Sequence, residues 1–483
     1  MEQFDLIIIG AGPGGYVAAI KAAKAGLSVA IIENRRPGGT CLNRGCIPAK
    51  AMIHASSLYR EALEGARFGV HAEDASYDYG EILKYKQDCI DSLVSGVEQL
   101  LKGNGVTLFA GTGRLEKAED GMNVVTVTEA ADGDGAGAAR KLTAKNVILA
   151  AGSKPAQIPV PGMDLPNVLN SDGLFALDHV PQSLLIIGGG VIGVEFATVF
   201  SNLGCEVTIV EALPKLLDNF DREISQNLKM ILKKRGVEAH LNAMVKECRE
   251  AEGGVCCVFE EKGKPQEIAA EYVLVAAGRQ PVTEGLFGDG VSLEMNGRFV
   301  AVDENFRTSV PGVYAIGDLT GGIQLAHAAS AHGSRAVEVI LQEAGGDGPA
   351  FAQDINVIPA GVYTDPEIAT VGLTEAQAKE QGFDVITGKF IMSANGKSLI
   401  TGDERGFIKV VADAGTDRIL GAQMMCSRAT DMIAEFATAI ANQMTSTDML
   451  RSVRPHPTYN EGIAEALEDL HGASVHTMPR KRR

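Results

Sequence analysis

Residues 7–15 read Ile-Ile-Ile-Gly-Ala-Gly-Pro-Gly-Gly, which is an apolar run that ends in a glycine-rich turn. The turn has the Gly-x-Gly-x-x-Gly pattern, and after an apolar helical stretch a second apolar run ends at Glu33. Such glycines allow a tight turn and a close approach of the backbone to a pyrophosphate, which the helix N-terminus then faces. The terminal carboxylate is placed to bind the adenosine ribose. The glycines concerned are Gly10, Gly12, Gly14 and Gly15.

The same pattern returns in the middle of the chain. Residues 185–193 read Leu-Ile-Ile-Gly-Gly-Gly-Val-Ile-Gly, and the next apolar run, residues 206–211, ends at Glu211. In both copies the acid follows the first glycine by 23 residues (33 − 10 and 211 − 188). One such match is weak evidence because ordinary turns produce it, but two copies at equal spacing predict two dinucleotide-binding βαβ units. The second set of glycines is Gly188, Gly190 and Gly193.

The composition is that of a globular protein with several domains. The 483 residues include 44 Lys and Arg against 61 Asp and Glu, a formal net charge of −17, and 45% are hydrophobic. An acidic chain is a poor partner for nucleic acid, whose phosphates are bound by Lys and Arg. No apolar run is long enough to span a membrane and the N-terminus lacks a basic segment, so we expect no membrane span and no signal peptide. Eight Cys are too few for a secreted disulfide scaffold, which favours a cytoplasmic location.

Two of the cysteines stand in an unusual setting. Cys41 and Cys46 lie five positions apart, with Gly45 and Pro48 on either side of the second. This pattern predicts a loop that enters a helix near residue 47, so that Cys46 lies at a helix N-terminus, where thiolate is favoured. Cys41, in the preceding loop, can then fold back to form a reactive disulfide. Lys50 follows Cys46 by four residues and shares its helix face. No further ligands are spaced for a metal, so we expect none.

The other six cysteines we interpret as structural. Cys256 and Cys257 are adjacent in a strand-like run, where neighbouring side chains point to opposite faces. Small buried hydrophobic side chains are the ordinary interpretation of these two and of Cys89, Cys205, Cys248 and Cys426.

The rest of the chain is predicted more coarsely from its hydrophobic periodicity. We expect a helical region over residues 56–101, strands over 114–149 around a loop at 131–137, and a helix over 221–235. From about residue 355 the pattern is that of a mixed α+β block, with a strand at 407–411 and a helix at 431–444. The basic residues 480–483 are expected to be a solvated tail.

The sequence resembles the flavoprotein disulfide reductases along nearly its whole length, most closely the members that oxidise dihydrolipoyl groups. Residues 39–48 are similar to the redox-active motif of that family, which is highly specific. Further matches are residues 150–153, 278–281, 315–318, 325–327, 363–367 and 456–458. The resemblance implies an α/β fold of two Rossmann-type dinucleotide-binding domains with an α+β dimerisation domain. The implied divisions are an FAD domain over 1–152, an NAD domain over 153–280, a central domain over 281–352, a dimer-interface domain over 353–475 and a tail over 476–483.

The resemblance also implies roles for individual residues. Cys41 is implied to exchange with a dithiol substrate, and Cys46 to lie against the flavin as a thiolate. Lys50 is implied to pair with Glu195 beside the flavin. His456 is implied to act as the thiol base, oriented by Glu461, in the site of the partner subunit. Besides Lys50, the residues implied to bind FAD and NAD are Gly10, Gly12, Gly14, Gly15, Glu33, Gly39, Thr40, Gly113, Gly152, Ser153, Gly188, Gly190, Gly193, Glu211, Gly278, Arg279, Asp318 and Ala326.

The implied reaction passes electrons from a dihydrolipoyl group through the Cys41–Cys46 disulfide and FAD to NAD⁺. Glu211 favours NAD over NADP, because a carboxylate binds a free 2′-hydroxyl and repels a 2′-phosphate. The implied partners are a second copy of the chain and a lipoyl-bearing protein of a 2-oxo acid dehydrogenase or glycine-cleavage system. Two alternatives stay open: a disulfide reductase or diaphorase with another acceptor, and a subunit whose main role is docking in such an assembly.

The sequence departs from the family pattern at several positions near these sites. Tyr459 and Asn460 replace a usual Leu-Ser pair after residues 456–458, and Cys426-Ser427-Arg428 replaces a usual Gly-Pro segment. His332 stands where the family often has Glu. The change at 459–460 lies beside the implied base, so we expect it to bear on substrate access.

Overall fold

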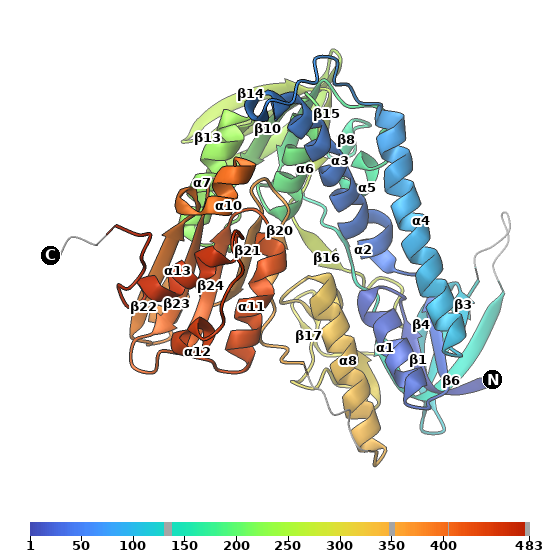
Figure 1. The fold of residues 1–483 in the computed structure, drawn as a ribbon. Coiled ribbons are helices and arrows are strands. Elements are labelled where there is room, and N and C mark those ends of the chain that lie inside the picture. The colour runs from blue at the N-terminus through green and yellow to red at the C-terminus, as the bar shows by residue number, and fades with distance from the viewer. Residues whose placement is uncertain (130–137, 347–352, 404, 479–483) are drawn as a thin grey trace.

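The computed structural model describes residues 1–129, 138–346, 353–403 and 405–478 (Figure 1). The predicted loop at 131–137 and the basic residues 480–483 lie outside the described residues. Two parallel βαβ units and an antiparallel C-terminal unit make up the molecule, which confirms the predicted fold class. None of the helices in the described ranges is long and apolar enough to cross a bilayer.

The first βαβ unit is built on a sheet with the strand order β3-β2-β1-β6-β5-β4. Its central strands pair in parallel, with residues 6–9 of β1 opposite residues 29–32 of β2. Both strands are buried on both faces at this end, which explains their continuous apolar sequence. The elements are β1 (Glu2–Ile9), α1 (Pro13–Lys24), β2 (Val29–Glu33), β3 (Thr107–Ala110), β4 (Thr112–Glu119), β5 (Met122–Thr128) and β6 (Ala139–Leu149).

A strand and a helix from much later in the chain complete this unit. β19 (Val313–Ala315) pairs in parallel with the last three residues of β6. Helix α8 (Ala326–Glu343) runs beside α1, as Figure 1 shows. The two helices approach closely because glycines meet at the contact: a Cβ at Gly333 would lie 2.4 Å from the carbonyl oxygen of Gly14. This packing brings the start of α8 to the first glycine turn.

The second βαβ unit repeats the arrangement with a five-stranded parallel sheet in the order β11-β10-β9-β15-β8. Its helix α6 is buried on nearly all sides, as its apolar sequence requires. The elements are β8 (Val168–Leu169), β9 (Ser183–Ile187), α6 (Val191–Asn202), β10 (Glu206–Glu211), α7 (Arg222–Lys234), β11 (Glu238–Leu241) and β15 (Tyr272–Val275).

A three-stranded antiparallel sheet inserted in this unit corrects our interpretation of two cysteines. It consists of β12 (Ala243–Ala251), β13 (Gly254–Glu261) and β14 (Lys264–Ala270). Cys248 and Cys257 lie directly opposite each other on β12 and β13 and form a disulfide, with 4.3 Å between their Cα atoms. The sequence indicates a structural role for both as small buried side chains, and the structure shows that this structural role is a disulfide. The cross-strand register brought them together, and the register depends on a bulge between Val245 and Glu247 that the sequence did not reveal.

The C-terminal unit is an antiparallel sheet in the order β20-β21-β24-β23-β22, covered by helices α11 and α13. It lies beside the second βαβ unit in Figure 1. Ion pairs hold α7 to it at both ends, between Lys409 and Asp221 at 3.2 Å and between Arg235 and Asp365. Its elements are β20 (Ala360–Val362), β21 (Ile368–Gly372), β22 (Val385–Ile391), α10 (Gly396–Thr401), β23 (Phe407–Asp413), β24 (Ile419–Met425), α11 (Ala429–Ala441) and α13 (Glu461–Asp469).

The helical region near the cysteines differs from the sequence prediction in two respects. The stretch predicted as helical over 56–101 is two helices, α3 (Cys46–Glu64) and α4 (Tyr79–Gly103), separated by a short 3₁₀ turn and an irregular segment. Asp78 begins α4 by accepting a hydrogen bond from the Glu81 amide at 3.0 Å. Cys41 lies in a short helix, α2 (Gly39–Arg44), and not in a loop. Gly45 alone separates α2 from α3, with φ −142° and ψ −106°.

Candidate active site

A cavity of about 750 Å³ lies where the first glycine turn, α2, α3, α6 and the start of α8 meet. We call it the central cavity. Val191 and Ile192, which begin α6 directly after the second glycine turn, also line it. The predicted site residues that line it are Gly10, Gly12, Gly14, Glu33, Gly39, Thr40, Cys41, Cys46, Lys50, Gly113, Gly152, Ser153, Glu195, Arg279, Asp318 and Ala326. One cavity thus joins the residues expected to bind FAD to the entrance of the second βαβ unit.

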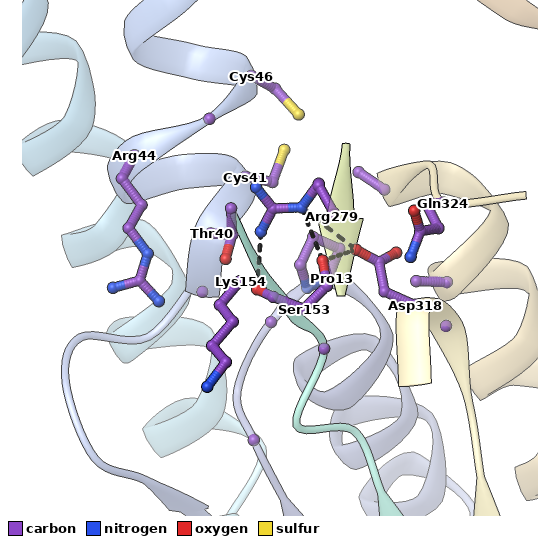
Figure 2. Close-up of a pocket in the computed structure, with 18 of the residues that line it drawn as sticks. Pro13, Thr40, Cys41, Arg44, Cys46, Ser153, Lys154, Arg279, Asp318 and Gln324 are labelled. Atoms are coloured by element: carbon purple, nitrogen blue, oxygen red, sulfur yellow. Dashed lines mark hydrogen bonds and ion pairs between the residues drawn. The ribbon is translucent and has the colours of Figure 1, made fainter. Parts of the chain in front are cut away.

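The two cysteines of the motif face each other at one end of the cavity (Figure 2). Both are free thiols here, and a hydrogen bond joins them. This bond from Cys41 lowers the pKa of the Cys46 thiol, and the Lys50 charge lowers it further against the opposing effect of burial. The same bond, together with burial, raises the pKa of Cys41. Cys46, the first residue of α3, is therefore the thiolate of the pair, as its place at a helix N-terminus requires.

An ion pair connects α3 to α6 beside the cysteines. Lys50 Nζ donates to both carboxylate oxygens of Glu195, at 2.9 and 2.8 Å. The Glu195 side chain is only 6% exposed, and its Oε1 also accepts the Tyr363 amide at 3.0 Å. Lys50 Nζ lies 4.5 Å from the centre of the Tyr363 ring. One carboxylate therefore ties together the first βαβ unit, the second βαβ unit and the C-terminal unit at the cavity wall.

The two acids at the strand ends are held in the same way. Glu33 accepts hydrogen bonds from the amides of Ala11 at 2.8 Å and Arg35 at 3.0 Å. Glu211 accepts them from Gly189 at 2.5 Å and Leu213 at 2.7 Å. Each partner in the second unit lies 178 residues after its counterpart, so the repeat extends from the sequence to the hydrogen bonds. Burial raises the pKa of Glu33, against the lowering effect of these amides.

The first glycine of each turn leaves no room for a side chain. Gly10 has φ +104°, and a Cβ there would lie 2.3 Å from the carbonyl oxygen of Ala150. Gly188 has φ +113°, and a Cβ there would lie 2.5 Å from the carbonyl oxygen of Ala276. Both turns therefore need glycine for conformation and for packing against the neighbouring strand. A Cβ at Gly190 or Gly152, in contrast, would meet no protein atom within 4 Å.

A polar triad of Ser153, Arg279 and Asp318 also lines the cavity (Figure 2). The Ser153 hydroxyl donates to Asp318 Oδ2 at 2.5 Å and accepts from Arg279 Nε at 2.7 Å. Arg279 Nη2 also donates to the Ser153 carbonyl oxygen at 2.7 Å. These bonds connect the short paired strands β7 (Ser153–Pro155) and β16 (Arg279–Pro281) to the turn that carries Asp318.

The predicted base lies elsewhere in the chain. His456 Nδ1 is 2.8 Å from Glu461 Oε1, and Glu461 Oε2 accepts the Thr458 amide at 2.9 Å. The pairing of His456 with Glu461 therefore has the expected geometry. The His456 side chain is 77% exposed and does not line the central cavity. A single chain does not bring it to Cys41 or Cys46.

Comparisons with known proteins show which family has this arrangement. Residues 4–333 match the pyridine nucleotide-disulphide oxidoreductase model, and residues 358–467 match the dimerisation domain of that family. The chain belongs to this family. It is 41% identical over 478 residues to the dihydrolipoyl dehydrogenase of Geobacillus stearothermophilus and 42% identical over 481 residues to that of Halobacterium salinarum. Each alignment covers 99% of this chain and 98% of the relative.

Solved structures of the family have the same fold. The HOCl-induced flavoprotein disulfide reductase RclA from Escherichia coli is similar with a TM-score of 0.82 and 28% identity, over 97% of this chain and 99% of that one. LpdA from Mycobacterium tuberculosis is similar with a TM-score of 0.86 and 25% identity, over 97% of this chain and 100% of that one. The chain is therefore an FAD-dependent oxidoreductase of the pyridine nucleotide-disulphide oxidoreductase family that also uses NAD(H).

The residues of the central cavity fit an FAD. The cavity extends from Glu33, at the end of β2, to the cysteines, and the open position at Gly152 leaves part of its wall free for a ligand. Gln324, just before α8, also lines the cavity, and its enclosed side-chain nitrogen has no hydrogen-bond partner among the described residues. Buried polar atoms without partners are rare in folded proteins, so this one indicates a ligand that the protein is built to hold.

Sequence reasoning assigned no role to Gln324 or Tyr363. Tyr363 was part of a matching motif, but only the structure shows its amide on Glu195 and its ring beside Lys50. Gln324 follows a Gly-Gly-Ile stretch and gives no signal by residue type or spacing.

Proposed function

We propose that this chain acts as a dihydrolipoyl dehydrogenase, oxidising protein-bound dihydrolipoyl groups with NAD⁺. The single observation that carries the proposal is the pair Cys41 and Cys46 in one cavity with Lys50 and Glu195, with Cys46 favoured as thiolate. A chain that matches curated dihydrolipoyl dehydrogenases over 99% of its length supports the substrate class. Bound FAD would supply the hydride that reduces NAD⁺, with Gly188, Gly190 and Gly193 at the pyrophosphate.

In the proposed reaction the two cysteines exchange with the substrate dithiol. In the oxidised enzyme a disulfide joins Cys41 to Cys46. A substrate thiolate attacks Cys41, which forms a mixed disulfide and releases Cys46 as the thiolate. The second substrate thiolate attacks the substrate sulfur of that mixed disulfide, which releases Cys41 and closes the lipoyl disulfide. Two electrons have then passed to the cysteines, and the low pKa of Cys46 stabilises it as the leaving group.

Deprotonation of the substrate thiols is the task proposed for His456 of the partner subunit. Glu461 fixes the ring through Nδ1, which leaves the other ring nitrogen to accept a proton. The dimerisation-domain match over residues 358–467 supports a homodimer in which this exposed histidine reaches the second chain's cavity. A lipoyl-bearing protein as the partner and a cytoplasmic location belong to the same proposal.

The test is steady-state turnover of the purified holoenzyme with two substrate pairs. Dihydrolipoamide with NAD⁺ should turn over rapidly, whereas NADPH with oxidised glutathione should not. The similarity to RclA makes another disulfide reductase the second candidate. NAD(P)H-dependent reduction of other disulfides without oxidation of dihydrolipoamide would favour that candidate and reject the first.

A further inference from the structure

The short helix α10 binds the segment that follows His456. Asn395, the N-cap of α10, is 3% exposed and accepts the Ser398 amide on its Oδ1 at 3.0 Å. The Asn395 Nδ2 atom donates to the carbonyl oxygen of Thr458 at 3.0 Å. At the other end of α10, the Thr401 hydroxyl lies 2.8 Å from the Tyr459 hydroxyl. Both ends of α10 therefore bind consecutive residues just after His456.

Tyr459 also reaches a second segment. Its hydroxyl donates to Asp403 Oδ2 at 3.3 Å, and the same oxygen accepts the Ser427 hydroxyl at 2.9 Å. Tyr459 and Ser427 both occupy positions where the sequence departs from the family pattern. The fold brings these two departures, 32 residues apart (459 − 427), onto one carboxylate oxygen. Burial raises the pKa of the Tyr459 phenol, so it remains a hydrogen-bond donor at neutral pH.

We propose that Tyr459 is a positioning residue for His456, acting through its hydroxyl bonds to Thr401 and Asp403. His456 itself is anchored by the Nδ1 contact to Glu461 on α13, while the following backbone is anchored by Asn395 and Tyr459. An exposed ring on a loop loses its preferred position readily, and a general base loses rate when it is displaced by a fraction of an ångström. One anchor on the ring and a second on the residues that follow it fix where the ring points.

This inference rests on the proposed role of His456 as the thiol base, and the variants separate the two claims. Tyr459→Phe removes the hydroxyl and keeps the packed ring. We expect the kcat for dihydrolipoamide oxidation to fall about fivefold, which is equivalent to about 1 kcal/mol, because the hydroxyl bonds to Thr401 and Asp403 are both lost. The KM for NAD⁺ and the NADH-dependent reduction of a dye should not change, since neither needs His456. Thr401→Ser should retain wild-type turnover, and Thr401→Val should lose turnover as Tyr459→Phe does.

A double variant excludes a merely structural role. In a His456→Ala background Tyr459→Phe should cause no further loss, because a residue that acts only through His456 has nothing left to position. Tyr77→Phe is the matched control, because it also removes a tyrosine hydroxyl that makes a hydrogen bond, in this case to the Leu203 carbonyl oxygen at 2.8 Å, but that bond does not involve the His456 segment. Equal losses from Tyr459→Phe in both backgrounds, or none in the wild type, would overturn the positioning role. If Tyr459→Phe is silent while His456→Ala loses most of its turnover, the proposed role of His456 stands without Tyr459. A His456→Ala variant that keeps wild-type dihydrolipoamide turnover overturns both the thiol base and its positioning by Tyr459, whereas a wild-type enzyme that does not oxidise dihydrolipoamide overturns the proposed function.

Discussion

Opposing influences on the Cys46 thiol together decide its charge. The hydrogen bond from Cys41 and the Lys50 ammonium favour the thiolate, whereas burial and Glu195 oppose it. The net effect lowers the pKa of Cys46 to about 7. Because the pKa of Cys46 is lowered, the thiolate is the main form above about pH 7, and it is protonated to the thiol as the pH falls through that value.

This charge makes a spectroscopic prediction for the two-electron-reduced holoenzyme. A thiolate beside an oxidised flavin gives a long-wavelength charge-transfer band, so the band should persist above about pH 7 and fade below it. Cys46→Ser should lack the band at every pH, because a serine hydroxyl does not ionise there. Cys41→Ser is the control and should show the band without any reduction, because Cys46 then has no disulfide partner and can be a thiolate while the flavin is still oxidised. A band of normal intensity in Cys46→Ser would contradict the assignment of the thiolate.

We propose that Glu211 decides between NAD and NADP. Both of its carboxylate oxygens accept backbone amides, which fixes the carboxylate beside the second glycine turn. Glu211→Arg replaces this charge with one that attracts a 2′-phosphate, so the ratio of kcat/KM for NADP⁺ to that for NAD⁺ should rise at least about tenfold. Glu206→Arg, at an exposed position on the same strand, should leave the ratio unchanged. The ratio comes from initial rates with each cofactor, and an unaltered ratio in Glu211→Arg would refute the 2′-hydroxyl argument.

At the scale of elements, the two βαβ units were fully predictable and the cysteine region was not. Gly10 and Gly188 signal their turns because no other residue fits there, so the sequence pattern and the geometry coincide. The sequence predicts a loop before the helix that begins near residue 47, and Gly45 gave no sign that Cys41 itself lies in a short helix, α2, that ends at Arg44. The Cys248–Cys257 disulfide depends on the register between β12 and β13. Residues 255–259 are all apolar, so their sequence does not indicate which side chains face the core, and the register cannot be predicted from it.

The two members of the ion pair between α3 and α6 should shift the pKa of Cys46 in opposite directions. Lys50 lowers the pKa of Cys46 and Glu195 raises it. Lys50→Met should therefore raise that pKa and slow iodoacetamide labelling of Cys46 at neutral pH by about tenfold, whereas Glu195→Gln should lower the pKa and speed labelling. Peptide mass spectrometry measures the labelling of this cysteine against pH. Lys84→Met, which breaks the exposed Lys84–Asp88 pair on α4, should have no effect. Shifts of the same sign in both variants would rule out the electrostatic account.

At the scale of the whole molecule, the residues of the proposed site fall into two groups, those that line the central cavity and the separate pair of His456 and Glu461. Residues from 9 to 363 contribute to the lining of one cavity in a single chain, so motifs that are far apart in the sequence become neighbours in space. His456 and Glu461 form their pair in the same chain, but His456 is exposed and neither residue lines that cavity. Without the resemblance to a family, nothing about a lone histidine among nine would have indicated a role in a second subunit's site.

Mixing two inactive variants tests whether each site is built from two chains. A Cys46→Ser chain keeps His456, and a His456→Ala chain keeps both cysteines. In a mixed dimer, the intact cysteines of the second chain would meet the intact histidine of the first. Random reassociation makes about half of the dimers mixed, each with one complete site of two, so equal amounts should regain roughly a quarter of wild-type dihydrolipoamide turnover.

The control for this complementation is each variant denatured and refolded alone, which should remain inactive. Wild-type protein carried through the same cycle gives the reference rate and corrects for incomplete reassembly. If His456 instead served the cysteines of its own chain, every dimer would contain only defective sites, because each chain lacks one partner. Mixed samples would then show no more turnover than the separate variants. Recovery of activity therefore follows only from the geometry in which the exposed histidine crosses to the neighbouring subunit.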